Sequence, residues 1–298
     1  MRKKYPKISI ITPVYNRGVL IKETIDSILD QSYPNLEYIV VNDGSTDDSL
    51  KVIRKYGNKL KVINQENQGE TTAVNRGLKM ATGEIIGIIN SDDLLLPHAL
   101  KEITSYMLKN PSVLAVYPDW KAIDEKGDTL KIVNVEDYNF LKMIKEHYCM
   151  PGPGTFFRRK ALMLANGRNE QFQYIADFAF WLKLGIHGTL SHLPKVLAAF
   201  RMHSKSQGIY AKGNDMAKEH KLLVDWIYHD YDLPQEANRF KKAAYASAYF
   251  HAAKESKGFY QKCKYFIESF LTNPITFAQK LKYEIVKIKS QNKVWNVQ

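Results

Sequence analysis

Cysteine is the scarcest residue type in this 298-residue chain, which contains only Cys149 and Cys263. Two cysteines so far apart do not form a disulfide framework or supply the paired ligands of a structural zinc site. Chains without such frameworks are typical of reducing compartments, so we expect a cytoplasmic protein.

Long apolar runs are also missing. No segment approaches the ~20 consecutive apolar residues that a helix needs to cross a bilayer. The first residues, MRKKYPKISIITPVYN, carry positive charge but lack a signal-peptide cleavage pattern. They predict a short tail followed by the first strand.

Several binding signatures are absent. There is no GxxxxGK followed by Ser or Thr, and no GxGxxG after the first predicted strand, so any nucleotide must be held in another way. No zinc finger, RNP motif or Arg-rich arm occurs, and we therefore expect no nucleic-acid partner. A basic nucleic-acid binder stays open as an alternative because the net charge is +12.

The residues that are present alternate between two hydrophobic periods. Strand-like runs at 7–14, 36–41, 60–63 and 85–89 are separated by helical patterns, which run from about 20 to 29, from Ser45 to Gly57, and from Thr71 to Ala81. Ser45 is the expected cap of the second helix, and Gly83 is the expected C′ glycine of the third. This order predicts an α/β fold built on a doubly wound, mostly parallel sheet with helices on both faces.

Beyond Pro97 the pattern is looser. It predicts a helix to about Lys109, a strand near 113–117, a helix over about 176–185, a strand over 196–203 and mostly helices from about 213. We therefore expect a first domain over 1–205, with a nucleotide-binding half at about 7–118 and an acceptor half at about 119–205. A mainly helical region over 206–298 follows it.

Polar residues follow the most hydrophobic strand, in the stretch EIIGIINSDDLLLP that begins at Glu84. In open α/β sheets, ligands bind beyond the carboxyl ends of the strands. The pair Asp92 and Asp93 therefore predicts a binding site, with a solvated turn as the structural alternative. The ends of the first two strands bring Thr12, Pro13, Tyr15 and Asp43 to the same edge, although Asp43 in an NDGS turn also suits a turn former.

Five segments carry a family resemblance: TPVYN, VVNDGSTDDS, NQGETTAVNRGL, ATGE and INSDDLLLP. Each is weak alone, but in this order and spacing they resemble family 2 glycosyltransferases of the GT-A fold over roughly residues 7–205. The resemblance implies an inverting, metal-dependent enzyme that moves a hexose-type sugar from a nucleotide-sugar, here a UDP-sugar, to a hydroxyl acceptor. It also implies a role in the synthesis of cell-surface polysaccharide or glycoconjugate, with a glycan or lipid-linked acceptor.

The resemblance also assigns residues to the donor. The expected nucleotide-binding set is Thr12, Pro13, Tyr15, Asp43, Gln68, Gly69, Asn75, Arg76, Asn90 and Ser91. The segment SDD stands for the DXD motif, with Asn90 in place of its first Asp, so Asp92 is the main expected ligand of Mn²⁺ or Mg²⁺. Asp93 supports it, and His203 in FRMHSKSQG joins them, with Arg201, Ser204 and Ser206 as neighbours.

The acceptor side is assigned in the same way. The segment YIADFAFWLKLG matches the family's general-base motif, in which Ala176 replaces a usual Glu and Asp177 remains. The resemblance makes Asp177 the expected catalytic base, and an Asp N-cap is its structural alternative. The loop CMPGPGTFF places Gly152, Gly154 and Thr155 near the acceptor and the transferred sugar.

Two other functions stay open at this stage. A sugar-nucleotide nucleotidyltransferase has a similar sheet but needs a Gly-rich basic loop, and the loop here reads TPVYNRG. A catalytically silent nucleotide-sugar-binding module would explain Asn90 and Ala176. The absence of a QxxRW motif and of flanking membrane spans argues against a cellulose- or hyaluronan-type polymer exporter.

The last third is the most basic part of the chain. Residues 205–298 contain 16 Lys and Arg against 9 Asp and Glu. Helical spacing puts Phe277, Leu281, Ile285 and Ile288 on one face, with Lys280, Lys282, Lys287 and Lys289 around it. This pattern predicts peripheral contact with the anionic inner face of the plasma membrane. Packing of the apolar face onto the first domain is the alternative.

Overall fold

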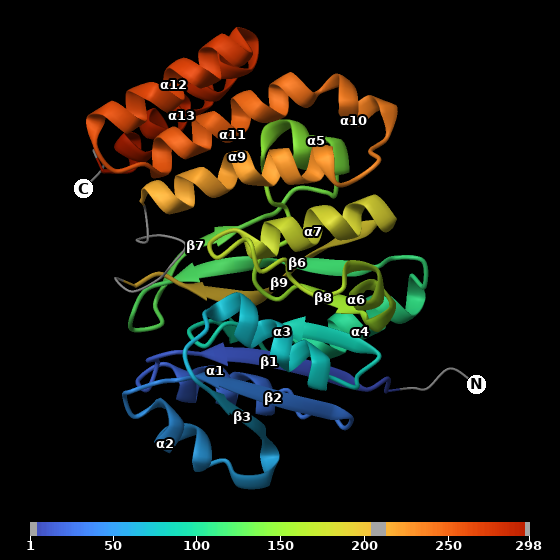
Figure 1. Ribbon diagram of the computed structural model, residues 1–298. Coiled ribbons are helices and arrows are strands. Elements are labelled where there is room, and N and C mark those ends of the chain that lie inside the picture. The colour runs from blue at the N-terminus through green and yellow to red at the C-terminus, as the bar shows by residue number, and fades with distance from the viewer. Residues whose placement is uncertain (1–4, 204–212, 296–298) are drawn as a thin grey trace. The chain divides into compact units, whose positions relative to one another are not determined.

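Strands and helices alternate along the first part of the chain, as the sequence predicts (Figure 1). The computed structural model describes residues 5–203 and 213–295, and side chains within the last helix as far as Ile288. The strands are β1 (Ile8–Val14), β2 (Leu36–Asp43), β3 (Lys61–Gln65), β4 (Ile85–Ile88), β5 (Leu94–Leu95), β6 (Ala115–Ile123), β7 (Thr129–Val133), β8 (Phe156–Arg158) and β9 (Leu190–Arg201).

The helices fall into an early and a late group. Those before residue 190 are α1 (Ile21–Leu29), α2 (Ser49–Arg54), the short 3₁₀ turn η1 (Gly57–Lys59), α3 (Glu70–Met80), α4 (Ala99–Lys109), α5 (Phe140–Glu146), α6 (Arg159–Ala165) and α7 (Ala176–His187). Those after it are α9 (Asn214–His229), α10 (Gln235–Arg239), α11 (Lys241–Glu255), α12 (Phe259–Thr272) and α13 (Pro274–Trp295).

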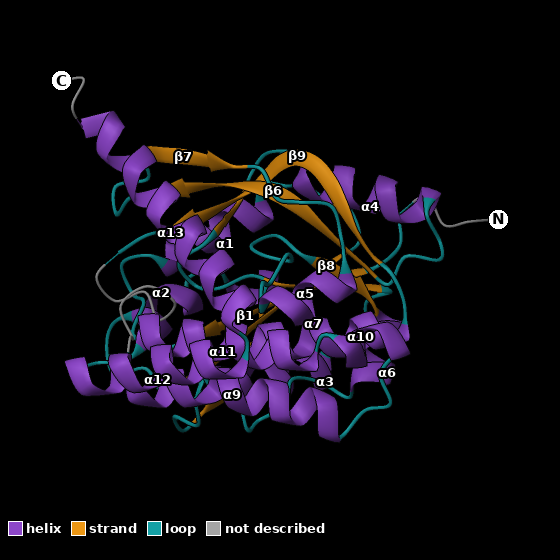
Figure 2. Ribbon diagram, turned by 90° about the horizontal axis from the view of Figure 1, so that it is seen from above, coloured by secondary structure: helices purple, strands orange, loops and turns teal. Residues whose placement is uncertain are grey.

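The described strands form one sheet in the order β3-β2-β1-β4-β8-β6-β9-β5, with β7 paired to β6. Strands β1 to β4 are mutually parallel where they pair, and β6 is parallel to β9. Strand β7 runs antiparallel to β6, and the arrowheads of the two strands point in opposite directions in Figure 2. Strand β8 runs antiparallel to both β4 and β6. The sheet is therefore mixed but mostly parallel in its first half, and the carboxyl ends of β1, β2 and β4 meet at one edge.

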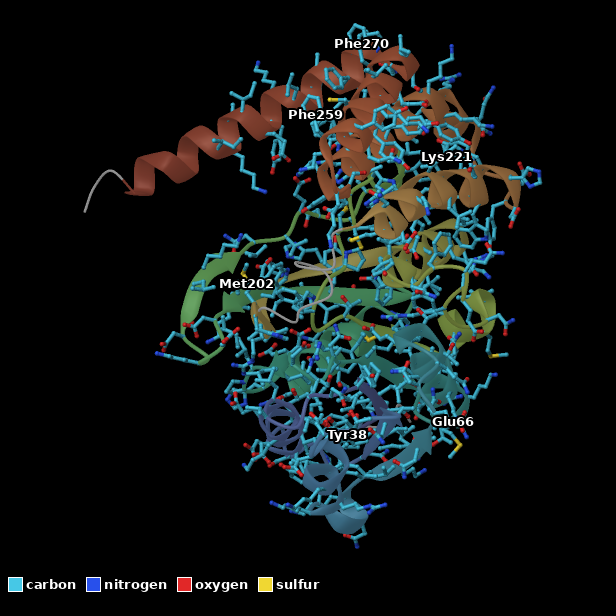
Figure 3. All side chains as sticks on the ribbon, turned by 60° about the vertical axis from the view of Figure 1, so that its left-hand side comes forward. Tyr38, Glu66, Met202, Lys221, Phe259 and Phe270 are labelled. Carbon is cyan, nitrogen blue, oxygen red and sulfur yellow. The ribbon has the colours of Figure 1, made fainter. Side chains whose placement is uncertain are left out.

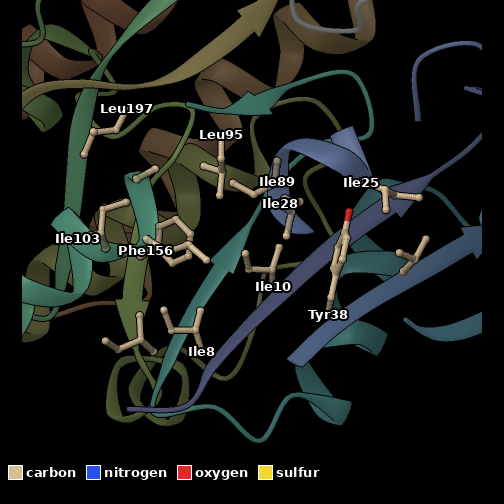
Figure 4. Packing of buried hydrophobic residues seen from close by; sticks show 14 of the residues in the cluster. Ile8, Ile10, Ile25, Ile28, Tyr38, Ile89, Leu95, Ile103, Phe156 and Leu197 are labelled. Atoms are coloured by element: carbon tan, nitrogen blue, oxygen red, sulfur yellow. The ribbon is translucent and has the colours of Figure 1, made fainter. Parts of the chain in front are cut away.

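Helices cover both faces of the parallel strands. On one face, Ile25 and Ile28 of α1 pack with Ile10 of β1 and with Tyr38 of β2 (Figure 4). On the other face, α3 lies so close that a Cβ on Gly77 would come within 2.5 Å of Ile11 Cγ2. All seven residues of β1 are buried, which explains why its sequence is almost continuously apolar. The predicted doubly wound arrangement is confirmed.

Two local predictions are wrong. Helix α2 begins at Ser49 rather than near Ser45, whose hydroxyl instead accepts a hydrogen bond from the Asn16 N–H at 3.1 Å. Gly83 is not a left-handed C′ residue. It lies against β1, where a Cβ would come within 2.4 Å of the Ser9 backbone nitrogen. The glycine is required there by close packing rather than by backbone conformation.

The chain divides into two compact units. The first contains Met1–Tyr138 and Cys149–Ser206, and the second contains Asn139–Tyr148 and Gln207–Gln298. The sequence assigned Asn139–Tyr148 to the acceptor half of the first domain, whereas α5 groups with the C-terminal helices. The reason is a contact with α11, since the Lys145 carbonyl of α5 accepts a hydrogen bond from Ser247 Oγ at 2.8 Å.

Buried histidines fill the centre of this second unit. His147 Nε2 lies 2.8 Å from His220 Nδ1, and the His251 ring stands 5.5 and 5.7 Å from the two other rings. Burial lowers the pKa of all three, to about 4 for His220. Lys280 is partly buried, and it donates a hydrogen bond to the Glu146 carbonyl. Its ammonium is therefore engaged within the unit, which differs from the exposed position expected for a lysine beside an apolar face.

None of the helices in the described ranges combines the length and the apolar character needed to cross a membrane.

A buried carboxylate ties the strands β1, β2 and β3 together. Glu37 of β2 accepts hydrogen bonds from Ser9 Oγ at 2.5 Å, Lys61 Nζ at 2.7 Å, the Thr82 N–H at 2.7 Å and Lys7 Nζ at 3.0 Å. Burial alone would raise the pKa of Glu37, but these donors outweigh it and hold the pKa well below its usual range. The charged form is thus the one that stabilises the fold.

We expect Glu37→Gln to reduce stability in a pH-dependent way. At pH 7 the change should cost about 1–3 kcal/mol, because buried donors lose a charged acceptor. The contribution of the carboxylate is complete above the usual Glu pKa of about 4.3 and is lost as the pH falls towards the folded pKa, so the difference should shrink below about pH 4. Urea unfolding across this pH range measures it, with exposed Glu66→Gln as the matched control. An equal difference at every pH would contradict the assignment.

Candidate active site

The end of β1 has a buried part and an exposed part. Thr12 is fully buried, and its hydroxyl lies 3.1 Å from the Tyr38 hydroxyl. Pro13 is also buried within the strand, beside Val41 of β2. Tyr15 follows the strand, and its side chain is 45% exposed. Of the residues assigned to the nucleotide here, Tyr15 is the one whose side chain is available for stacking, while Thr12 braces the core beneath it.

Asp43 organises the loop that enters α3. Its carboxylate is buried and accepts hydrogen bonds from Gln65 Nε2 at 2.7 Å and from the N–H groups of Gln68 and Gly69, both at 2.9 Å. Gln68 and Gly69 therefore contribute backbone donors to Asp43, and their predicted contacts with the nucleotide stay predictions. The bonds from Gln65 and Gln68 both end on Oδ1, so Oδ2, which accepts only from Gly69, keeps a lone pair for a ligand.

Asn75 and Arg76 lie farther along α3. The Asn75 amide is engaged on both sides: Oδ1 accepts from the Arg168 N–H at 2.8 Å and Nδ2 donates to the Arg168 carbonyl at 2.9 Å. Arg76 is exposed and donates to Gln65 Oε1 at 3.4 Å. The structure thus uses Asn75 to hold a distant loop, and Arg76 stands at the rim of the site.

The turn after β4 holds its two carboxylates in different environments. Asn90 to Asp93 form a turn in which the Asp93 N–H donates to the Asn90 carbonyl at 3.2 Å, and Ser91 is buried. The Asp93 carboxylate is also buried and accepts from the Arg201 N–H at 3.1 Å. Burial, and then the charge of Asp92, raises the pKa of Asp93 well above its usual range. Asp93 therefore faces the protein, and it supports the turn.

Asp92 faces the site with two basic partners. Its Oδ2 lies 2.9 Å from His203 Nε2 and 3.3 Å from Arg17 Nε. The sequence assigned Asp92 and His203 to one metal, and the fold brings these residues together across 111 positions of sequence. Arg17, which the sequence reasoning missed, follows the first strand in the TPVYNR segment. Ser204 and Ser206, predicted as neighbours, lie outside the described residues.

Arg201 ends β9 and is 1% exposed. Its guanidinium donates to the Asp92 carbonyl at 3.2 Å, to the carbonyls of Asp124 and Glu125 at 3.3 and 3.1 Å, and to Glu23 Oε2 at 2.6 Å. The sequence named Arg201 only as a neighbour of His203. In the structure it joins α1, the SDD turn and the β6–β7 turn.

The glycine loop before β8 forms a tight turn. Thr155 is buried, and both its N–H and its hydroxyl donate to the Gly152 carbonyl. Gly154 has φ +77°, and a Cβ there would come within 2.7 Å of Ala198 Cβ. These three residues therefore shape the loop through backbone contacts, and their predicted place beside the sugar or acceptor stays a prediction.

Asp177 is exposed in the first turn of α7. Its Oδ1 accepts from the Phe178 N–H at 2.7 Å, and no described residue donates to its other oxygen. The N-cap position is Ile175, so the structural alternative of an Asp N-cap is wrong. Phe178, Phe180 and Trp181 are buried and anchor the helix, as the sequence predicts.

Glu70 connects the separate parts of the site electrostatically. Burial raises its pKa, the nearby Arg168 opposes this, and the charges of Asp177 and Asp92 both raise it further. Burial, and then the charge of Asp177, likewise raises the pKa of the Cys149 thiol. The charges of Asp177 and Asp92 therefore both act on Glu70, which pairs directly with Arg168 at 3.1 Å. Sequence reasoning missed Glu70 because an acidic residue in the first turn of a helix is ordinary.

Asp92, Asp93 and His203 are the side chains that the sequence assigns to a metal ion. No three His, Cys, Asp or Glu side chains in the described ranges gather closely enough to hold an ion by themselves. Mg²⁺ and Mn²⁺ bound with phosphates commonly use one or two protein ligands and complete their shell with phosphate and water oxygens. The Asp92 carboxylate and the His203 imidazole fit that arrangement, and the inward-facing Asp93 does not.

Comparisons with known proteins agree with this architecture. The chain is 30% identical over 251 residues to hyaluronan synthase from Pasteurella multocida. The aligned region covers 80% of this chain and 25% of that protein. It spans about a quarter to a third of the length of the polysaccharide synthases that it matches. The missing QxxRW motif argued against a hyaluronan-type polymer exporter, whereas one of the similar proteins is named a hyaluronan synthase.

Solved structures share the fold at low sequence identity. S. aureus TarS 1–349 in complex with UDP-GlcNAc has a TM-score of 0.65 and 19% identity, covering 93% of this chain and 92% of that chain. The mannosyltransferase PcManGT from Pyrobaculum calidifontis, in complex with GDP-Man and Mn²⁺, has a TM-score of 0.63 and 19% identity. The match covers 98% of this chain and 84% of that chain. The predicted GT-A fold is confirmed.

A family model supplies the assignment. The model described as glycosyl transferase family 2 matches residues 9–164, more than half of the chain, and this range includes the ends of β1, β2 and β4. The chain therefore belongs to glycosyl transferase family 2 and is a glycosyltransferase.

Proposed function

We propose that this glycosyltransferase moves a hexose-type sugar from a UDP-sugar to a hydroxyl group of a glycan or lipid-linked acceptor, with inversion at the anomeric carbon. The observation that carries the proposal is the position of Asp92 beyond β4, where its carboxylate lies 2.9 Å from His203 Nε2 and 3.3 Å from Arg17 Nε. This geometry supports a diphosphate end at Asp92, and the exposed carboxylate of Asp177 supports an acceptor end. The similarity to a polysaccharide synthase supports a role in polysaccharide or glycoconjugate synthesis.

The donor end is assigned to the edge formed by β1, β2 and β4. Tyr15 is exposed for stacking on the base, and Asp43 retains acceptor capacity for the nucleoside. Asp92 and His203 would hold Mn²⁺ or Mg²⁺, which when bound offsets the charge that develops on the leaving diphosphate. The Arg17 guanidinium, 3.3 Å from Asp92, adds a positive charge at the same place. TarS with UDP-GlcNAc and PcManGT with Mn²⁺ support a nucleotide-sugar and a divalent ion.

The acceptor end is assigned to Asp177. An acceptor hydroxyl is a weak nucleophile, and a positioned carboxylate strengthens it by taking its proton as the new bond forms. The hydroxyl oxygen bonds to C1 of the sugar from the side opposite the diphosphate, the C1–oxygen bond to the β-phosphate breaks, and the hydroxyl proton passes to Asp177. UDP leaves, and the configuration at C1 is inverted.

The metal assignment predicts different effects at two carboxylates. Asp92→Ala should abolish turnover and the part of UDP affinity that depends on Mn²⁺, because it removes the metal ligand. Asp43→Ala should weaken UDP binding with or without Mn²⁺, since its contact is to the nucleoside. Calorimetric titration of UDP with Mn²⁺ and with EDTA separates these effects, and exposed Asp48→Ala is the control. Equal affinity of the wild type under both conditions would refute the role of Asp92.

Turnover of a UDP-sugar in the same samples distinguishes the enzyme from a silent binding module. A functional site should release UDP slowly from the preferred UDP-sugar even without acceptor. A silent module would bind the donor and release none.

The base assignment predicts a large effect of Asp177→Asn. Asn preserves the size and the hydrogen bond to the Phe178 N–H, so the variant should fold and bind UDP-sugar with near-normal affinity. Loss of a general base typically costs ~10²–10⁴-fold in rate, so transfer should slow at least about a hundredfold. Steady-state transfer assays measure it, with binding of UDP-sugar as the control for folding. Retention of more than about a tenth of the turnover would rule out Asp177 as the base.

We also propose that α12 and the start of α13 contact an anionic membrane surface on the cytoplasmic side, where lipid-linked acceptors are found. Large apolar side chains are exposed there: Phe259 by 83%, Tyr260 by 78%, Leu271 by 73% and Ile275 by 72% (Figure 3 labels Phe259). Exposed lysines such as Lys262 and Lys264 share α12 with them. Apolar side chains beside cations suit an interface with anionic headgroups.

The membrane proposal predicts that acidic substitutions in the exposed apolar surface of α12 and α13 weaken binding to anionic vesicles. The double change Leu271→Asp and Ile275→Asp should weaken binding to phosphatidylglycerol-containing vesicles about tenfold or more, because each apolar side chain contributes roughly 1.5–3 kcal/mol when buried. Vesicle flotation at low salt measures it, and UDP affinity should be unchanged. Absence of wild-type flotation would overturn the proposal, and self-association through these residues would assign the surface to a second copy instead.

A further inference from the structure

Glu70, in the first turn of α3, forms an ion pair with Arg168, which precedes α7. Arg168 Nη1 donates to Glu70 Oε1 at 3.1 Å, and the Arg168 side chain is 8% exposed. The other oxygen of Glu70 accepts no hydrogen bond from the described residues. Within the same residues, Arg168 Nε is buried without an acceptor and Nη2 has none. The pair therefore keeps both an acceptor and a donor that the protein does not use.

The position of the pair follows from its neighbours on α3. Glu70 comes directly after Gly69, whose N–H is bound to Asp43 at the nucleoside end. Thr71, the next residue, donates to the Phe172 carbonyl in the segment that leads to Asp177. Burial, and to a smaller extent the charges of Asp177 and Asp92, raises the pKa of Glu70. In an in-line displacement, the sugar lies between the leaving diphosphate and the attacking hydroxyl. Under the proposed function, Glu70 therefore stands where the transferred sugar must lie.

The loop that carries Arg168 is fixed to α3 by further contacts. Asn75 holds the Arg168 peptide group through both atoms of its amide, and Thr71 Oγ1 donates to the Phe172 carbonyl at 3.0 Å. Gly167 has φ +80°, and a Cβ there would come within 2.8 Å of Asn75 Oδ1. These contacts hold Arg168 in place before any ligand binds, which reduces the entropy lost on binding.

We propose that Glu70 and Arg168 are the sugar-binding pair of this site, and that they select the donor by hydrogen bonds to neighbouring hydroxyl groups of the transferred hexose. This inference rests on the proposed function. A carboxylate accepts from one hydroxyl and a guanidinium donates to the oxygen of the next, so the pair is sensitive to the configuration at adjacent ring carbons. Thr71 and Asn75 act as positioning residues for the pair, through the loop.

The chemistry also explains why a pair serves better than either residue alone. An unpaired buried guanidinium is costly, and an unpaired carboxylate between Asp92 and Asp177 would add to their mutual repulsion. Pairing balances both charges in the free enzyme. A sugar lacking a hydroxyl group at the right position leaves these polar groups without their ligand contacts, which is a strong basis for rejection.

The test compares sugar selectivity with nucleotide affinity. UDP, UDP-glucose, UDP-galactose, UDP-GlcNAc and UDP-glucuronate are titrated calorimetrically, with Mn²⁺, into the wild type, Glu70→Gln, Arg168→Lys and the exposed control Glu66→Gln. For the sugar that the wild type binds best, Glu70→Gln should reduce the advantage over UDP about tenfold, as expected for loss of hydrogen bonds to a charged group. Arg168→Lys should also reduce it, because the ammonium lacks the planar fork of donors.

Affinity for UDP itself should change less than about twofold in both variants and not at all in Glu66→Gln, since the pair contacts only the sugar. Unchanged sugar selectivity in Glu70→Gln and Arg168→Lys would overturn the inference. An equal loss for UDP and for UDP-sugars would also overturn it, by assigning the pair to the nucleotide or to the fold. A wild type that binds neither UDP nor any UDP-sugar would instead remove the proposed function itself.

Discussion

The buried guanidinium of Arg201 is the constraint on which the geometry of the site depends. A charge that is removed from water costs several kcal/mol unless every donor finds a partner. Here the partners come from Glu23 on α1, from the Asp92 carbonyl and from the turn between β6 and β7. These segments are far apart in sequence, so the arrangement is complete only when the whole sheet is in place. The bond from Arg201 to the Asp92 carbonyl helps to fix the SDD turn, and His203 follows Arg201 by two residues at the end of β9.

The site contains several carboxylates, and each of them has its own hydrogen-bond or ion-pair partners that offset its negative charge. Asp43 receives backbone N–H groups, Asp92 receives His203 and Arg17, and Glu70 receives Arg168. Asp93 is buried against the Arg201 N–H, and its raised pKa favours the neutral acid. Under the proposed function, a donor with two phosphates would meet a surface whose charges are already partly balanced, so its binding would need little rearrangement of these side chains.

The first half of the fold was predictable because its signals are local. The apolar run of β4 and the spacing of Ile21, Ile25 and Ile28 reflect burial within a single element. The carboxyl ends of parallel strands share an edge, which places Asp43 and Asp92 in one region before any coordinates are known. The link from Asp92 to His203 came only from the family resemblance, since no periodicity connects residues so distant.

Other features had no local signal. Glu70 reads as an ordinary acidic residue of a first helical turn, and Arg168 as a loop residue, so their ion pair across 98 positions of sequence was not visible. Asn75 looked like a ligand, but its amide is occupied by the Arg168 peptide group. Ser45 resembled a helix cap because Ser and Asp suit both caps and turns, and the tertiary contact with Asn16 decided between them. Long-range pairing decided each of these cases.

The membership of α5 in the second unit has a consequence for how the chain can be divided. The backbone passes from one unit to the other after residues 138, 148 and 206. A cut at the boundary that composition suggests, near residue 205, would leave α5 in the catalytic fragment without Ser247, His220 and Lys280, the residues that satisfy its buried groups. The catalytic fragment would then expose a helix meant for burial, and the C-terminal fragment would lack part of its core. The two units are thus interleaved in sequence, so neither can be obtained intact by a single cut of the chain.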